Sequence, residues 1–308
     1  MENILSYYYD LHPESIKKEE EKYIFEYENN KYVLQQYKRP LEDIYDLYNM
    51  NTKMVENKIL VHEIILNNQN QILTYEKDVP YVLMQIKINP NAKISLSDIC
   101  YISNSSIIKE ENSILIRNNW VTLWEIKYDF FESQINEIGT KYSHLCNILN
   151  YYIGLAENAI SFVRGALMID DVSYMSVNNK RINSKDSLYE LFNPMNYIYD
   201  YRVRNLCEYI KSAFFNGEDA YMIVEDFFNN NYLGFKETLL FYGRLLYPSY
   251  FFDKYDEIVN NDLNEDEING IVIMSKKYEQ FLKDVYFYIS KLHNKYIPPI
   301  DWLIKKEA

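Results

Sequence analysis

Residues 22–37 read KYIFEYENNKYVLQQY, and this stretch sets the architecture of the first part of the chain. Aromatic and β-branched residues, which favour strands, fill 23–27 and 32–37, on either side of an Asn-Asn pair. Asparagine tolerates the left-handed backbone conformation that a tight hairpin turn needs. The pattern therefore predicts a β-hairpin.

The segments that follow this hairpin carry mostly strand signals. Apolar residues recur at helical spacing over 41–56, which predicts one helix there. Residues 59–66 and 71–75 predict a second hairpin, and 80–88 predict a further strand. The expected order is strand, strand, helix, strand, strand, strand.

The rest of the chain is predicted to be helical after a connector. Asn89-Pro90-Asn91 interrupts the strand pattern, and the helical period begins at Asn119. A loop-rich stretch is expected over about 170–199. We therefore predict an α+β, bilobal plan. It has a small sheet-rich lobe over 1–88, a connector over 89–118 and a helical lobe over 119–308.

Composition excludes several classes of protein. The 308 residues are 48% apolar, which is enough for a sizeable core and argues against disorder. The net charge of −13 argues against binding to nucleic acid or to anionic membranes. Residues 1–10 lack the basic and apolar parts of a signal peptide, and no apolar run is long enough to span a bilayer. We expect neither nucleic-acid partners nor membrane insertion.

Three cysteines, Cys100, Cys146 and Cys207, are odd in number and far apart in the sequence. None has the spacing of a CxxC motif or of a Cys/His zinc site. A disulfide framework is therefore not expected, and the free thiols fit a reducing cytoplasm.

Three later segments carry a family resemblance: YYIGLAENA at 151–159, DYRVRNLCEYI at 200–210 and YGRLLYP at 242–248. In this order they resemble the spore-coat kinase-like proteins of the CotS and YutH type, and most closely the YutH branch, which is related to aminoglycoside phosphotransferases. The resemblance implies a protein-kinase-like fold. It also implies a place in the mother-cell cytoplasm or the spore coat, with other proteins as partners, for which spore-coat components are candidates.

Active relatives close over ATP with a glycine-rich loop, because only glycine lets the backbone approach phosphate without a Cβ clash. No glycine occurs before Gly139 in this chain. The turn at 27–31 instead lies beside Glu26 and Glu28, which would repel a triphosphate. The sequence therefore predicts the scaffold without the nucleotide loop.

The small-lobe lysine of active relatives is also replaced. Tyr32-Val33-Leu34-Gln35 matches the expected strand, so Gln35 stands where the cation should be. Glutamine has no charge to pair with phosphate. Lys38 lies three residues further along, and we interpret it as a solvated residue at the strand end.

The catalytic loop is expected at about 174–183. There Asn179 takes the place of the histidine, and Arg181 takes the place of the catalytic aspartate. An arginine cannot accept a proton from a substrate hydroxyl. Asp170 and Asp171 precede this loop and are fallback candidates, although a cap at the end of the preceding helix is the favoured interpretation.

The metal-binding aspartate is expected near Asp200, which follows the apolar run 197–199. In the YutH-like pattern this residue opens an Asp-x-x-x-Arg-Asp-Leu motif, whose second aspartate is Asn205 here. We favour Asp200 as the cap of a helix that begins near Arg202 over a role as a Mg²⁺ ligand.

Together these losses predict a catalytically inactive pseudokinase that serves as a scaffold or protein-binding component and needs no cofactor or metal. One alternative is an active ATP- and Mg-dependent phosphotransferase of small molecules with relocated residues such as Asp170, Asp171 or Asp200. Another is a nucleotide or metabolite sensor without chemistry. The state of the cleft between about 85–95 and 175–200 distinguishes these hypotheses. An open, charged cleft favours nucleotide binding, and a cleft filled by side chains favours the inactive protein.

Overall fold

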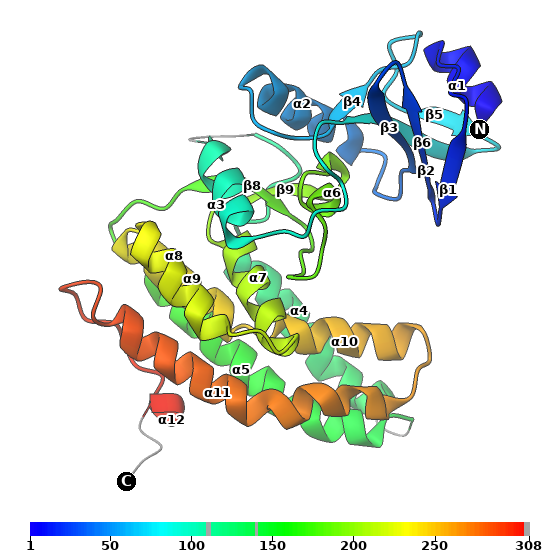
Figure 1. Ribbon diagram of the computed structural model, residues 1–308. Coiled ribbons are helices and arrows are strands. Elements are labelled where there is room, and N and C mark those ends of the chain that lie inside the picture. Colours follow the sequence, from blue (N-terminus) through cyan, green and yellow to red (C-terminus); the bar gives the residue numbers. More distant parts are fainter. Residues whose placement is uncertain (109–111, 139–140, 305–308) are drawn as a thin grey trace. The chain divides into compact units, whose positions relative to one another are not determined.

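The computed structural model describes residues 1–108, 112–138 and 141–304, and it divides into two compact units (Figure 1). The first unit comprises Met1–Ile116 and Met175–Asp200, and the second comprises Arg117–Tyr174 and Tyr201–Ala308. The expected α+β plan is confirmed, since a sheet-rich part is followed by helices. The predicted division at 1–88, 89–118 and 119–308 follows composition along the chain and stays a prediction.

An antiparallel sheet forms the core of the first unit. Its strands run in the order β1-β2-β3-β6-β4, and β5 also pairs with β6. The predicted hairpin is confirmed as β2 and β3, and its turn residues Glu28 and Asn29 both have positive φ, at 48° and 62°. The six strands are β1 (Ile16–Glu19), β2 (Lys22–Tyr27), β3 (Asn30–Gln36), β4 (Glu63–Ile65), β5 (Thr74–Glu76) and β6 (Val79–Ile86).

The second predicted hairpin is wrong. Strand β4 pairs with Leu83–Gln85 and β5 pairs with Val79–Tyr81, so both of them meet β6 and not each other. β6 spans 8 residues, which is long enough to pair with one short strand at each half of its length. Neighbouring strand signals therefore gave the right strands and the wrong partners.

Two N-terminal elements were not predicted: helix α1 (Glu2–Tyr9) and strand β1. β1 reads IKKE and is mostly exposed, so it lacks the apolar alternation that reveals a strand. Charged edge strands of this kind resist pairing with other chains. The turn between β1 and β2 consists of Glu20 and Glu21, and Glu20 has a positive φ of 51°.

The first unit also contains helices and a small second sheet. Helix α2 (Asp43–Glu56) confirms the helix predicted at 41–56, and α3 (Leu96–Ser105) is a helix inside the predicted connector. The small sheet has the order β7-β8-β9. Its strands are β7 (Ile107–Ile108), β8 (Met175–Asn179) and β9 (Tyr197–Tyr201), and between β8 and β9 lie α6 (Leu188–Leu191) and the 3-10 turn η1 (Pro194–Asn196).

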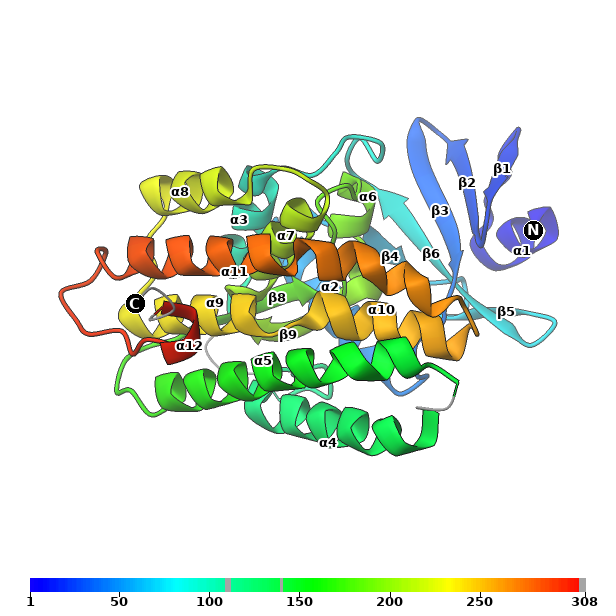
Figure 2. The ribbon, with the colours of Figure 1, turned by 90° about the horizontal axis from the view of Figure 1, so that it is seen from below.

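The second unit is helical, as predicted. Figure 2 shows α5 lying between α4 and α9, in agreement with the packing of α5 on both helices. Among the described residues no helix has the length and hydropathy to cross a membrane. The helices are α4 (Trp120–Ile138), α5 (Ser143–Leu167), α7 (Arg204–Phe215), α8 (Ala220–Asn230), α9 (Phe235–Leu246), α10 (Ser249–Asn260), η2 (Glu265–Ile268), α11 (Asn269–Ile289) and α12 (Asp301–Ile304).

One glycine sets the contact between α5 and α9. A Cβ added to Gly243 would lie 2.4 Å from Cγ2 of Val163, which is closer than real contacts allow. Gly243 belongs to the 242–248 segment that carried the family resemblance, so part of that motif serves helix packing.

Candidate functional site

Gln35, the residue in the place of the small-lobe lysine, lies on β3 and reaches residues 183–193, which we call the groove segment. Its side-chain oxygen accepts hydrogen bonds from the Tyr189 hydroxyl at 2.7 Å and from Nδ2 of Asn193 at 3.0 Å. An amide oxygen has two lone pairs, so both are used within the protein. A polar contact inside the chain thus replaces the expected cation.

A lysine that sequence reasoning missed lies beside Gln35. Lys22 on β2 stands directly opposite Gln35 in the antiparallel register, so the two side chains share a face. Its Nζ lies 2.6 Å from Oε1 of Glu190 and 4.1 Å from the centre of the Tyr189 ring. The other oxygen of Glu190 accepts a hydrogen bond from Asn196 at 3.2 Å. The predicted turn fixes this register, so extending it back along β2 would have found Lys22.

The backbone of the groove segment binds the predicted connector. The amide of Leu188 donates to the Ala92 carbonyl at 2.7 Å, and that of Tyr189 donates to Pro90 at 3.3 Å. In the other direction the amide of Ile94 donates to Asp186 at 3.1 Å. The groove segment belongs to 175–200, so the two sides of the cleft that the sequence left either open or filled are bonded directly to each other here.

Asn179, the residue in the place of the catalytic histidine, also contacts the groove segment. It is buried on β8, and its Nδ2 donates to the carbonyl oxygens of Glu190 and Leu191, both at 3.1 Å. Arg181 lies exposed in the loop after β8. The structure thus brings Gln35 and Asn179 to one segment, where each side chain holds backbone or side-chain groups of this chain.

His62 is a second residue that sequence reasoning did not single out. It is fully buried after α2, and its ring lies 5.0 Å from that of Tyr189. Nε2 faces the Tyr189 carbonyl at 3.2 Å, while Nδ1 has no hydrogen-bond partner among the described residues. Burial lowers the pKa of His62 to about 4, so the ring is neutral at pH 7.

Asp200 does not cap the next helix, so that prediction is wrong. Helix α7 begins at Arg204, and its N-cap residue is Val203. Asp200 is fully buried at the end of β9, and its backbone carbonyl accepts a hydrogen bond from Nδ2 of Asn178 at 3.2 Å. Among the described residues no group of three or more His, Cys, Asp or Glu side chains is arranged to hold a metal ion.

Asp171 belongs to the second unit and caps a helix other than the one predicted. Its carboxylate accepts from the amides of Val172 at 2.8 Å and of Lys236 at 3.2 Å. Lys236 lies in the first turn of α9, whereas the expected partner was the end of α5. The bonds from Val172 and Lys236 lower the pKa of Asp171. A carboxylate at a helix N-terminus is favourable because it meets unpaired amides there.

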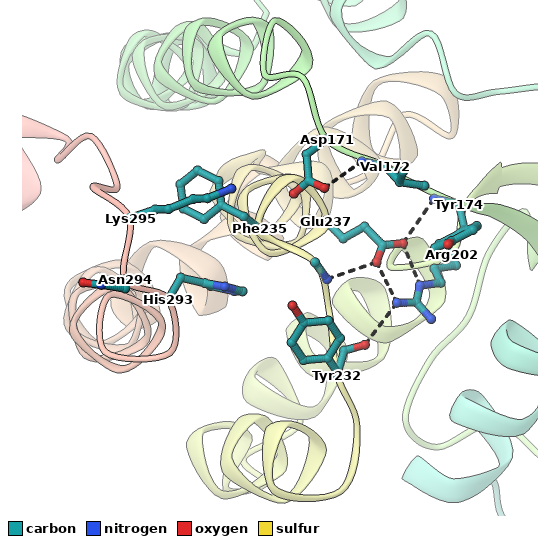
Figure 3. A pocket seen from close by; sticks show the side chains of 11 residues that line it. Asp171, Val172, Tyr174, Arg202, Tyr232, Phe235, Glu237, His293, Asn294 and Lys295 are labelled. Carbon is teal, nitrogen blue, oxygen red and sulfur yellow. Dashed lines mark hydrogen bonds and ion pairs between the residues drawn. The ribbon is translucent and has the colours of Figure 1, made fainter.

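A pocket of about 500 Å³ lies around this end of α9 in the second unit (Figure 3). In its wall, Arg202 and Glu237 form a bidentate pair, with both N–O distances at 2.6 Å. Arg202 also donates to the Tyr232 carbonyl at 3.0 Å. Glu237 is buried and accepts from the Tyr174 amide at 3.2 Å. Arg202 and Glu237, two of the charged side chains in the wall, therefore bind each other, which fits a structural role for this pair.

Solved structures share this fold. An aminoglycoside phosphotransferase from Alicyclobacillus acidocaldarius subsp. acidocaldarius DSM 446 matches with a TM-score of 0.68 at 8% identity, covering 94% of this chain and 96% of that one. Spectinomycin phosphotransferase APH(9)-Ia, solved with ADP and spectinomycin, matches with a TM-score of 0.54 at 10% identity, covering 90% and 92%. These matches confirm the kinase-like fold and show nothing further.

Sequence comparison gives the family. The endospore coat-associated protein YutH of Bacillus subtilis (strain 168) is 23% identical over 173 residues, which are 50% of each chain. The match therefore spans about half the length of that relative. The family model described as "Spore coat putative kinase YutH" matches residues 2–285, and so covers both units. The resemblance seen in the sequence is confirmed, and the chain belongs to the YutH family of spore-coat putative kinases.

Proposed function

We propose that this protein is a non-catalytic member of its family that serves the spore coat or the sporulating cell by binding other proteins. On this proposal its nucleotide groove is closed, because the groove segment on one side bonds directly to residues 90–94 on the other. The observation that carries the proposal is the set of hydrogen bonds from residues 186–193 to residues 90–94 and to Gln35.

Phosphoryl transfer requires several charged parts at once, because the reaction depends on positioning and charge stabilisation. Gln35 is neutral, and Asn179 and Arg181 cannot act as a general base. Lys22 supplies a cation near the expected place, but Glu190 holds it at 2.6 Å. The groups that would hold and move a phosphate are thus absent or bound to the protein.

Opening the groove would be unfavourable. Leu191 and Phe192 are buried at 0% and 1% exposure, and exposing each side chain costs about 1.5–3 kcal/mol. Each broken backbone hydrogen bond adds about 0.5–1.5 kcal/mol. A total of about 4 kcal/mol already weakens apparent affinity about 1,000-fold. Millimolar nucleotide would therefore bind little of the protein.

The proposed association with the spore coat is supported by the coat-associated relative and by the family to which the chain belongs. The net charge of −13 supports a protein partner over nucleic acid, whose backbone favours basic surfaces. A scaffold of this kind needs a stable fold and no turnover.

Thermal melting with Mg-ATP at about 5 mM tests the proposal. The melting temperature of the full chain should change by less than about 1 °C, since a ligand stabilises only the folded state that binds it. An active aminoglycoside phosphotransferase serves as the positive control and should shift clearly. A clear upward shift for this chain at pH 7 would contradict a groove that is closed at neutral pH.

One observation favours a second function, an ATP-dependent phosphotransferase with relocated residues. Lys22 and Glu190 converge beside Gln35, so a cation and a carboxylate meet where an active site would need them. On this alternative Lys22→Met abolishes ATP turnover that the unmodified protein shows. Absence of any turnover in the unmodified protein would exclude it.

A further inference from the structure

Tyr189 of the groove segment contacts two nitrogen-containing side chains of the first unit, those of Lys22 and His62. The Lys22 ammonium lies 4.1 Å from the ring centre, and the His62 ring centre lies 5.0 Å away at an interplanar angle of 30°. A cation near an aromatic face is attracted by the ring. The neutral imidazole adds a stacking contact to the same side chain.

His62 can stay in this place only while it is neutral. In the neutral ring the nitrogen that faces the Tyr189 carbonyl at 3.2 Å carries the proton and donates it. Nδ1 is then a lone pair, which has no hydrogen-bond partner among the described residues. A second proton would place a buried N–H without an acceptor at Nδ1, and burying an unpaired charge is strongly unfavourable.

The charged neighbours do not compensate for that proton. From β2 comes Lys22, a second cation whose charge opposes protonation. From α6 comes Glu190, whose oxygens already accept from Lys22 and Asn196. From α2 comes the neutral amide of Asn51, which donates to the His62 carbonyl at 2.7 Å.

The next residue, Glu63 on β4, pairs with Lys87 at 3.0 Å and so is engaged elsewhere. Lowering of the His62 pKa to about 4 by burial agrees with this arrangement. A second proton on the His62 ring would therefore weaken the contacts of His62 with the groove segment. These contacts are made with Tyr189 and with Phe192, whose carbonyl accepts from the His62 amide at 3.0 Å.

We propose that His62 and Tyr189 form an acid-sensitive latch: protonation of His62 weakens the attachment of the groove segment to residues 90–94 and to Gln35, so that the segment opens more often while the main sheet stays folded. The inference rests on the proposed function only in that this segment closes the groove. Opening would uncover the connector backbone and expose Gln35 and Lys22, which are half-buried in the closed state, as a larger binding surface.

Hydrogen exchange of the full chain at pH 7 and at about pH 4 tests the latch, after correction for the intrinsic effect of pH on exchange. The amides of Leu188, Tyr189 and Ile94 should lose about tenfold or more of their protection at acid pH. The amides of β3 and β6 should keep theirs. In His62→Phe and His62→Gln, which carry no titrating ring, the three amides should lose much less protection at acid pH. What loss remains there reports Asp186 of the same segment, whose pKa is raised by burial.

Two results would overturn the latch: loss of protection in the His62 variants equal to that in the unmodified protein, or joint loss from the groove segment and the main sheet. Using both variants guards against one that fails to fold. A failure of the proposed function would give another result, namely stabilisation of the protein by nucleotide at pH 7. His62 is neutral at that pH, so this result does not depend on the latch.

Discussion

At the scale of single residues, Gln35 shows how one neutral side chain can hold a cleft closed. Its oxygen accepts from two donors of the groove segment, and its strand neighbour Lys22 binds Glu190 of the same segment. A lysine at position 35 would lack an acceptor for Tyr189 and would put a second ammonium beside Lys22. The local chemistry therefore suits internal contacts better than a phosphate.

Replacing Gln35 by methionine should lower the free energy of unfolding by about 1–3 kcal/mol. The change leaves the Tyr189 hydroxyl and the Asn193 amide without their acceptor, and an unsatisfied buried donor carries a penalty of this size. Chemical denaturation measures the loss. Gln36→Met on the same strand is the matched control and should change stability little. Equal effects of the two substitutions would contradict the structural role of Gln35.

The stability of the protein should depend on pH through His62. Its folded-state pKa of about 4 lies below the ordinary value of 6.5, so the unfolded state binds the proton more tightly. The contribution is full above pH 6.5 and is lost as pH falls toward 4, up to about 3 kcal/mol. Denaturation midpoints of the unmodified protein minus those of His62→Phe measure it. A flat difference over this range would contradict the assignment.

Among the elements, helix α9 depends on two contacts that could not be read from the 242–248 segment alone. Gly243 lets it approach α5 within the reach of Val163. At the same end, the buried Lys211 of α7 donates to the carbonyls of Arg244 and Tyr247 and pairs with Glu208 at 2.8 Å. Helix C-termini leave carbonyls unpaired, and Lys211 supplies their donors.

Gly243→Ala should destabilise the protein by about 1–3 kcal/mol, because the added methyl group overpacks the contact with Val163. Gly165→Ala on α5 is the control, since nothing lies within 4 Å of its added Cβ. That change should be neutral or stabilise by up to about 1 kcal/mol, because alanine favours helices over glycine. Thermal unfolding of both variants checks the pair, and an unperturbed Gly243→Ala protein would contradict the close approach.

Lys211→Met should cost about 3–5 kcal/mol, since it removes one partner of a buried ion pair and leaves carbonyls of α9 unpaired. Lys254→Met is the control. Lys254 bridges Glu257 and Glu267 near the surface, where ion pairs contribute about 0–1 kcal/mol. Similar losses for the two variants, measured by denaturant titration, would contradict the buried role of Lys211.

The elements that the sequence predicted are those with a strong local period. Helix α2, the long helices of the second unit and the hairpin of β2 and β3 were all expected. The edge strand β1 was missed because its charged side chains hide the period, and α3 was missed inside an Asn- and Ser-rich stretch. The start of α3 nevertheless carries a sequence signal, the capping box of Ser95 and Asp98.

For the whole molecule, the replacements at Gln35, Asn179 and Arg181 were visible in the sequence, but the contacts of the groove segment were not. Gln35 and Tyr189 are 154 positions apart, and no local pattern predicts a pairing at that distance. The helix that Asp171 caps was wrong for the same reason, because α9 meets Asp171 only in the folded chain. The family resemblance predicted the fold, and only the coordinates show that the groove segment bonds to residues 90–94 and to Gln35.

A crystal structure of the full chain grown with millimolar Mg²⁺ and a non-hydrolysable ATP analogue is the most direct measurement. We predict that residues 186–189 stay hydrogen-bonded to 90–94, that Tyr189 still donates to Gln35, and that no nucleotide lies between them. A well-ordered nucleotide in that place, with the groove segment displaced and side chains of this protein on its phosphates, would contradict the account.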